Sequence, residues 1–195
     1  MPTKARALTA LAVLSLALVL APNVLAPTVA RTQDAPARTE DELRGLLNGA
    51  WFLTVSRSQG QAAIDRGIER AVAEMNFFLQ GVTRQQVHDS TPVNERIDIG
   101  FTPEGRITVG FDQRFTYTTR PGVAQDFDVP GTGNVNVTQL FRGGHLEQIF
   151  TATLGRRWNT YDLSADGRTM TCTSTMQGPM MPVPVVFTLS YRQRT

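Results

Sequence analysis

The residue types that usually perform catalysis or bind metals are few in this chain and widely spaced. His88 and His145 lie far apart, and neither has a second histidine or a cysteine at metal-ligand spacing. The carboxylates of Asp65, Glu69 and Glu74 fall on what reads as the solvated face of a helix. No G-x-S-x-G elbow and no P-loop occurs. The sequence therefore predicts no catalytic residue, no metal site and no cofactor, and it favours a protein that is not an enzyme.

Cys172 is the only cysteine in the chain. An intramolecular disulfide and a thiolate metal cluster are therefore both excluded. The residue lies in a threonine-rich alternating run, where a small buried hydrophobe is the usual role of a free cysteine. The alternatives are an intermolecular disulfide and a reactive thiol.

Residues 1–30 have the form of an export signal. A short basic region precedes an apolar run over residues 7–21, which is short for a membrane span. Two small-residue cleavage patterns follow, and Pro27 would stand beside the first cut. We therefore predict a signal peptide cleaved after Ala30 and a periplasmic or secreted protein. The alternative is an uncleaved signal anchor.

Removal of this segment leaves a chain without net charge. It contains two of the 19 basic residues and none of the 17 acidic ones, so 17 of each sign remain. No cluster of lysine and arginine of the kind that follows a phosphate backbone is present, and nucleic acid is not a predicted partner. The remaining length suits one domain with its own core.

The longest helical pattern runs from Ser58 to about Val82. Ser58 and Gln61 have the spacing of a capping box, and the apolar residues share one sector of the helical wheel. That sector contains Ile64, Ile68, Ala71, Val72, Met75, Phe78, Leu79 and Val82. Phe77 falls opposite it, and either contacts a neighbouring short helix or makes a weak contact with a membrane or a partner protein.

Strand patterns occur once before this helix and repeatedly after it. Trp51, Leu53 and Val55 alternate with more polar positions, and from Val93 onward period-two alternation recurs between turn signals. About ten strands result, nine of them consecutive and joined by short connections. We predict a mainly β fold, a single up-and-down antiparallel β-barrel with a helical insertion after its first strand.

These patterns give three segments of different character. Residues 1–30 are the signal peptide, and residues 31–48 are an N-terminal segment with a short helix. A capping box at Thr39 and Glu42 begins that helix, and Asn48-Gly49 ends it. Residues 49–195 are the barrel domain, with a helical lid over residues 58–91.

Gly49-Ala50-Trp51 opens the first strand, which is followed by a helix pair and then nine strands. Both features resemble the calycins, the superfamily of lipocalins and fatty-acid-binding-protein-like barrels. The G-x-W triplet matches the lipocalin signature, which implies that Trp51 closes one barrel end beneath a guanidinium from Arg192 or Arg194. The order of elements is more like the fatty-acid-binding branch, whose two helices form a lid.

The last strand departs from that branch, which usually carries an Arg-x-Tyr pair for the carboxylate of its ligand. Here Tyr191 and Arg192 are adjacent, and adjacent strand residues face opposite sides of a sheet. A fatty-acid carboxylate site is therefore not predicted.

The lid and the inward strand faces supply the predicted ligand-binding residues. Gln139, Gln148, Tyr117 and Tyr191 place polar groups on apolar faces, where each group needs a hydrogen-bond partner. They either orient a ligand or bond one another, water or solvent. The predicted set is Ile64, Ile68, Met75, Phe78, Phe111, Tyr117, Gln139, Gln148, Phe150, Phe187 and Tyr191.

The sequence thus favours an exported, non-enzymatic, lipocalin-like protein that binds a small apolar ligand in a barrel cavity beneath its lid. The alternative is an envelope structural or protein-interaction module with a packed barrel and no ligand. An enzyme would need inward polar groups that converge. The identity of the ligand stays open.

Overall fold

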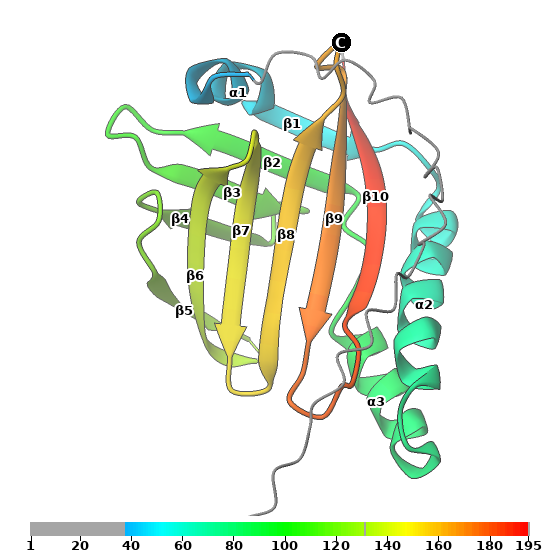
Figure 1. The fold of residues 1–195 in the computed structure, drawn as a ribbon. Coiled ribbons are helices and arrows are strands. Elements are labelled where there is room, and N and C mark those ends of the chain that lie inside the picture. Colours follow the sequence, from blue (N-terminus) through cyan, green and yellow to red (C-terminus); the bar gives the residue numbers. More distant parts are fainter. Residues whose placement is uncertain (1–37, 131, 195) are drawn as a thin grey trace, which may run out of the picture. The chain divides into compact units, whose positions relative to one another are not determined.

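The computed structural model describes residues 38–130 and 132–194, in which ten strands form one antiparallel sheet (Figure 1). The signal peptide and the cut after Ala30 lie outside these residues. Among the described helices, none combines the length and apolarity needed to cross a bilayer. The elements are α1 (Glu40–Leu47), β1 (Gly49–Leu53), α2 (Arg57–Ala73), α3 (Phe77–Asp89), β2 (Arg96–Phe101), β3 (Ile107–Phe111), β4 (Phe115–Thr119), β5 (Gln125–Val129), β6 (Gly133–Arg142), β7 (His145–Ala152), β8 (Gly155–Leu163), β9 (Thr169–Gln177) and β10 (Val185–Gln193).

The strands follow one another around a nearly closed barrel. Their order in the sheet is β4-β3-β2-β1-β10-β9-β8-β7-β6-β5, so β1 pairs with both β2 and β10. The predicted up-and-down barrel is confirmed, and so is its calycin-like order of one strand, a helix pair and nine strands.

The barrel is left open along one line, between β4 and β5, which we call the seam. These two strands stand at opposite ends of the sheet order and are not hydrogen-bonded to each other. Side chains bridge the seam instead. Gln139 Nε2 on β6 donates to the backbone oxygen of Tyr117 on β4 at 3.2 Å, and Thr119 Oγ1 donates to Gln139 Oε1 at 3.3 Å.

Helix α1 closes one end of the barrel. The capping box at Thr39 and Glu42 forms as predicted. Leu47 is buried, and the indole nitrogen of Trp51 donates to its backbone oxygen at 2.8 Å. The guanidinium of Arg44 lies 5.0 and 5.1 Å from the ring centroids of Phe101 and Phe141, which stack on each other.

The predicted role of Arg192 in this closure is wrong. Trp51 faces the interior and is fully buried, whereas Phe52 and its cross-strand partner Arg192 belong to the outward alternation. Arg192 is exposed. The other arginine proposed for the indole, Arg194, lies over the ring of Phe52, 4.0 Å from its centroid. The guanidinium that covers aromatic rings at this barrel end is that of Arg44 on α1.

The long helix predicted over residues 58–82 is two helices. The first begins at Arg57, and its N-cap lies two residues before the predicted one, because the capping box uses Ser56 and Gln59. It ends at Ala73, and Asn76 caps a second helix by accepting the Phe78 N–H at 3.0 Å. Asparagine is favoured at such an N-cap and disfavoured inside a helix. Within the predicted lid, the residues that follow Val82 continue α3 to Asp89.

Because of this break, the helical wheel drawn over residues 58–82 does not describe the residues beyond Ala73. Ile64 and Ile68 are buried as predicted, but Phe78 is 85% exposed and cannot line the interior, so that prediction is wrong. Phe77 is 80% exposed, which is also incompatible with its burial against another helix. The new helix starts in a new direction, so residues that share one face on a continuous wheel separate here.

Helix α2 runs alongside β10 at close range (Figure 1). The close approach depends on Gly67, where an added Cβ would lie 2.6 Å from the backbone oxygen of Val186. A bidentate contact between Arg84 and Glu69 joins α3 to α2, with Nη2 and Oε2 3.0 Å apart. The helix pair is therefore fixed to the barrel along α2.

Replacement of Gly67 by alanine should lower the free energy of unfolding by about 1–3 kcal/mol, the usual cost of overpacking against backbone. Gly81→Ala is the matched control, because no atom lies within 4 Å of the added Cβ in the middle of α3. That control should raise stability by about 0.5–1 kcal/mol, since alanine is the better helix former. Urea denaturation measures both, and equal effects would contradict the close α2–β10 contact.

Candidate functional site

Strand β8 carries polar side chains into the barrel. Arg157, Asn159 and Tyr161 occupy alternate positions and so share its inward face. The Tyr161 hydroxyl donates to Gln148 Oε1 on β7 at 2.7 Å, and Ser174 Oγ on β9 donates to Asn159 Oδ1 at 2.7 Å. These five residues, the interior polar network, connect three neighbouring strands.

One donor of this network has no partner. Gln148 is fully buried, and its amide nitrogen Nε2 makes no hydrogen bond within the described part of the chain. Its oxygen is already occupied by Tyr161 and by Asn159 Nδ2 at 3.4 Å. A buried donor without a partner costs about 1–3 kcal/mol. The amide is therefore available to an acceptor outside the described residues.

The second available donor is Arg157. Its Nε donates to Asn159 Oδ1 at 3.1 Å and its Nη2 to Ser174 Oγ at 3.2 Å. A guanidinium has five N–H groups, and those of Arg157 that make neither of these bonds stay unused. No carboxylate of the described residues forms an ion pair with it. Its guanidinium also lies 5.9 Å from the ring centroid of Phe187. The interior thus contains a positive charge with spare donors.

Arg157 stands at an accessible part of the interior. Its cross-strand neighbours are Phe150 on β7 and Met176 on β9, and all three side chains are only partly buried. Asn159 and Tyr161, further along the same strand face, are fully buried. Arg157 and its two apolar neighbours are therefore less buried than the rest of this strand face.

An aromatic cluster includes Phe150, the cross-strand neighbour of Arg157. Tyr117 makes edge-to-face contacts with Phe127 on β5 at 5.1 Å and with Phe150 at 5.2 Å between centroids. Phe111 packs on the same ring at 6.3 Å. The cluster spans the seam, and it brings three of the predicted ligand-binding residues together.

The hydroxyl and thiol groups of the interior keep their protons at neutral pH. Burial raises the pKa of Tyr117, Tyr161, Tyr191 and Cys172, that of Cys172 to about 12. The charge of Arg157 acts in the opposite direction on the pKa of all four groups, which come from four strands. The positive charge of Arg157 therefore partly offsets the effect of burial on the pKa of all four groups.

The other predicted residues take separate positions. Gln139 is engaged at the seam, and the Tyr191 hydroxyl donates to the backbone oxygen of Asn94 at 3.0 Å. Ile64, Ile68 and Met75 pack in the core. None of the predicted set lines either of two pockets of about 570 and 410 Å³. The cavity beneath the lid stays a prediction.

Sequence reasoning missed four members of the network: Arg157, Asn159, Tyr161 and Ser174. The sequence gives no clear signal for them, because both alternate sets of side chains over residues 157–162 mix polar and aromatic types. Among the described residues, no group of three or more histidine, cysteine or acidic side chains is arranged to hold a metal ion.

Comparison with known proteins finds similarity in structure only. No protein-family model matches the chain, and no curated sequence matches it. The Echinococcus granulosus fatty-acid-binding protein 1 is 12% identical, with 77% of this chain and 99% of that chain covered and a TM-score of 0.48. For the fluorescent protein UnaG the identity is 13%, the coverage 75% and 96%, and the TM-score 0.49. An SAHS protein from Ramazzottius varieornatus is 11% identical over 76% and 96%, with a TM-score of 0.47. The calycin-like fold is assigned here from the order of strands and helices.

Cys172 should not react with iodoacetamide at pH 8 in the folded protein and should react in urea, because the buried thiol keeps its proton. Its pKa rises on folding from 9.0 to about 12, so the stability that it contributes is complete below pH 9 and is lost as the pH rises towards 12. The free energy of unfolding should therefore decline less steeply above pH 9 in Cys172→Ala than in wild type. Rapid alkylation of the folded protein would show an accessible, reactive thiol instead.

Proposed function

We propose that this is an exported, non-enzymatic protein that binds a small apolar molecule inside its barrel, with α2 and α3 as the lid. One observation carries the proposal: the buried amide nitrogen of Gln148 has no partner within the described chain and belongs to the same network as the unpaired Arg157. Both groups are donors, and they stand among apolar side chains.

The two donors, Gln148 Nε2 and the Arg157 guanidinium, determine which end group the ligand needs. A carbonyl or carboxylate oxygen accepts from an amide N–H and from a guanidinium, and a carboxylate would also neutralise the charge of Arg157. Phe150 and Met176 flank the guanidinium and would contact an apolar body. The ligand is therefore an apolar molecule with an oxygen-bearing end group, and it binds differently from a carboxylate held by the last strand, where Arg192 points outward.

The composition of the network favours binding over catalysis. It contains two amides, two hydroxyls and a guanidinium, and no carboxylate or histidine. Burial raises the pKa of the Tyr161 phenol well above its ordinary value, so the phenol does not act as a base near neutral pH. A general base needs a pKa close to the working pH.

Export rests on the sequence of residues 1–30, whose short basic region, apolar run and small residues before Ala30 have the form of a cleaved signal.

Native mass spectrometry of protein from its own host tests export and binding together. The mass of the denatured chain should correspond to a start at Arg31, and the native mass should exceed it by one small molecule. A full-length chain would contradict the cleavage, and repeated absence of any ligand would contradict the binding.

Arg157→Met should weaken binding of 8-anilinonaphthalene-1-sulfonate, an apolar anion, by about ten- to a hundredfold. Hydrogen bonds to a charged group contribute about 1.5–3 kcal/mol, and each 1.4 kcal/mol is about tenfold in affinity. Arg156→Met is the matched control, because Arg156 is the adjacent residue of β8 and faces outward over Trp158. Fluorescence titration measures both. Equal affinities of the two variants would place the probe elsewhere and contradict the interior site.

A second function is favoured by the outer surface of α3. Phe77, Phe78 and Val82 are 72–85% exposed, and Leu79 is partly exposed. A contiguous exposed apolar surface of this kind usually contacts a membrane or a partner protein. In this alternative the barrel is an interaction module of the cell envelope, and the contact is made through α3.

Phe77→Ser should leave the thermal unfolding temperature unchanged and reduce recovery of the protein with phosphatidylcholine vesicles or with a partner in a pull-down. The folded state loses no buried contact, since Phe77 touches mainly the ring of Phe78. Phe115→Ser is the control, an exposed phenylalanine on β4 away from α3. The idea fails if Phe77→Ser and the control behave alike in both assays.

A further inference from the structure

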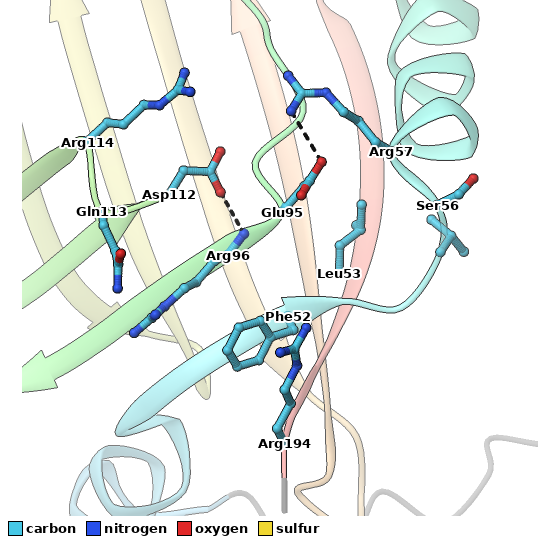
Figure 2. Close-up of a pocket in the computed structure, with 11 residues that line it drawn as sticks. Phe52, Leu53, Ser56, Arg57, Glu95, Arg96, Asp112, Gln113, Arg114 and Arg194 are labelled. Atoms are coloured by element: carbon cyan, nitrogen blue, oxygen red, sulfur yellow. Dashed lines mark hydrogen bonds and ion pairs between the residues drawn. The ribbon is translucent and has the colours of Figure 1, made fainter.

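A pocket of about 570 Å³ lies beside the barrel, where distant segments of the chain meet (Figure 2). The end of β1, the first turn of α2, the start of β2, the β3–β4 hairpin and the chain after β10 all contribute to it. Its lining shares no residue with the interior polar network. We call it the arginine pocket, after Arg57, Arg96, Arg114 and Arg194.

The charges of the arginine pocket do not balance. Its lining holds four arginines and two carboxylates, Glu95 and Asp112, a formal excess of two positive charges. Both carboxylates are already engaged: Glu95 Oε1 lies 3.2 Å from Arg57 Nη1, and Asp112 Oδ1 accepts the backbone N–H of Arg96 at 2.8 Å (Figure 2).

The excess falls to one positive charge when Asp98, the partner of Arg96 outside the lining, is counted, but two of the arginines have no such partner. Arg96 pairs with Asp98 at 2.7 Å, whereas Arg114 and Arg194 form no ion pair with any residue in 38–130 or 132–194. Both of these side chains are exposed to solvent in the pocket. Two guanidinium groups are therefore free to bind an anion.

Aromatic stacking holds one of these groups in place. The guanidinium of Arg194 lies 4.0 Å from the centroid of the Phe52 ring, and that of Arg96 lies 5.5 Å from it. A stacked guanidinium presents its N–H edge to a planar fork of oxygen atoms. Stacking on Phe52 thus lowers the entropy that Arg194 would lose when an oxyanion binds.

The backbone holds the second group. Asp112 and Gln113 both have positive φ, +48° and +58°, and they are the central residues of the turn from Phe111 to Arg114. The Arg114 N–H closes that turn by donating to the Phe111 oxygen at 2.9 Å. Glutamine rarely adopts this conformation, and such backbone strain persists where the surroundings impose it. The tight turn fixes the position from which Arg114 reaches the pocket.

We propose that the arginine pocket binds a phosphate monoester. A phosphate monoester carries about −1.5 to −2 charges at pH 7, and its oxygens accept bidentate hydrogen bonds from arginine, so it suits the guanidinium groups of Arg114 and Arg194. The volume also accommodates an organic group attached to the phosphate. The site is separate from the interior one, so the protein has two ligands of different chemistry.

The test is calorimetric titration with phenyl phosphate at low ionic strength. Wild type should bind one equivalent, and Arg114→Gln combined with Arg194→Gln should weaken binding at least tenfold. Arg120→Gln is the matched control, an exposed arginine outside the pocket. Inorganic phosphate should bind at the same residues with lower affinity, because it has no organic group to contact the pocket.

The two sites can be told apart. The double variant should keep wild-type affinity for 8-anilinonaphthalene-1-sulfonate, and Arg157→Met should keep wild-type affinity for phenyl phosphate. Absence of phenyl phosphate binding in wild type, or equal binding by the double variant and Arg120→Gln, overturns the proposal. Loss of phenyl phosphate binding in Arg157→Met alone also overturns it, since the anion would then occupy the interior.

Discussion

The double pairing of β1 is the constraint on which the rest of this structure depends. This strand hydrogen-bonds to β2 on one side and to β10 on the other, so residues 49–53 join the beginning of the barrel to its end. The elements that flank it are placed as a consequence. Helix α1 closes the barrel end above Trp51, and α2 leaves the other end of β1 and packs against β10 at Gly67. The same pairing brings Phe52 beside the chain end that carries Arg194.

The interior combines an apolar core with a polar network of five side chains. Burial of amides and hydroxyls is tolerated only where hydrogen bonds replace those to water. Most of the network meets that condition across β7, β8 and β9, and the amide nitrogen of Gln148 does not. The unsatisfied donor and the charge of Arg157 lie at neighbouring positions of the interior, and the proposed ligand binding rests on these two groups.

Several features of the fold were predictable because they depend on residues that are close together in the sequence. Period-two alternation and turn residues predicted the meander of strands, and a capping box predicted α1. The break at Asn76 was missed, although its side chain is a good helix N-cap, because a helical wheel assumes one continuous axis. The inward face of β8 was missed for a different reason. Its polar residues look solvent-exposed in sequence, and only their hydrogen-bond partners on neighbouring strands account for their burial.

The sequence by itself determined the order of elements, the antiparallel character of the sheet and the opposite orientation of Tyr191 and Arg192, since each follows from neighbours along the chain. Tertiary structure decided which polar side chains meet. Gln148, Asn159 and Ser174 converge through strand register, and the four arginines of the pocket come from segments up to 137 residues apart, Arg57 to Arg194. Register and closure are properties of the assembled sheet, because they depend on pairing between strands and on the point at which β1 joins β10.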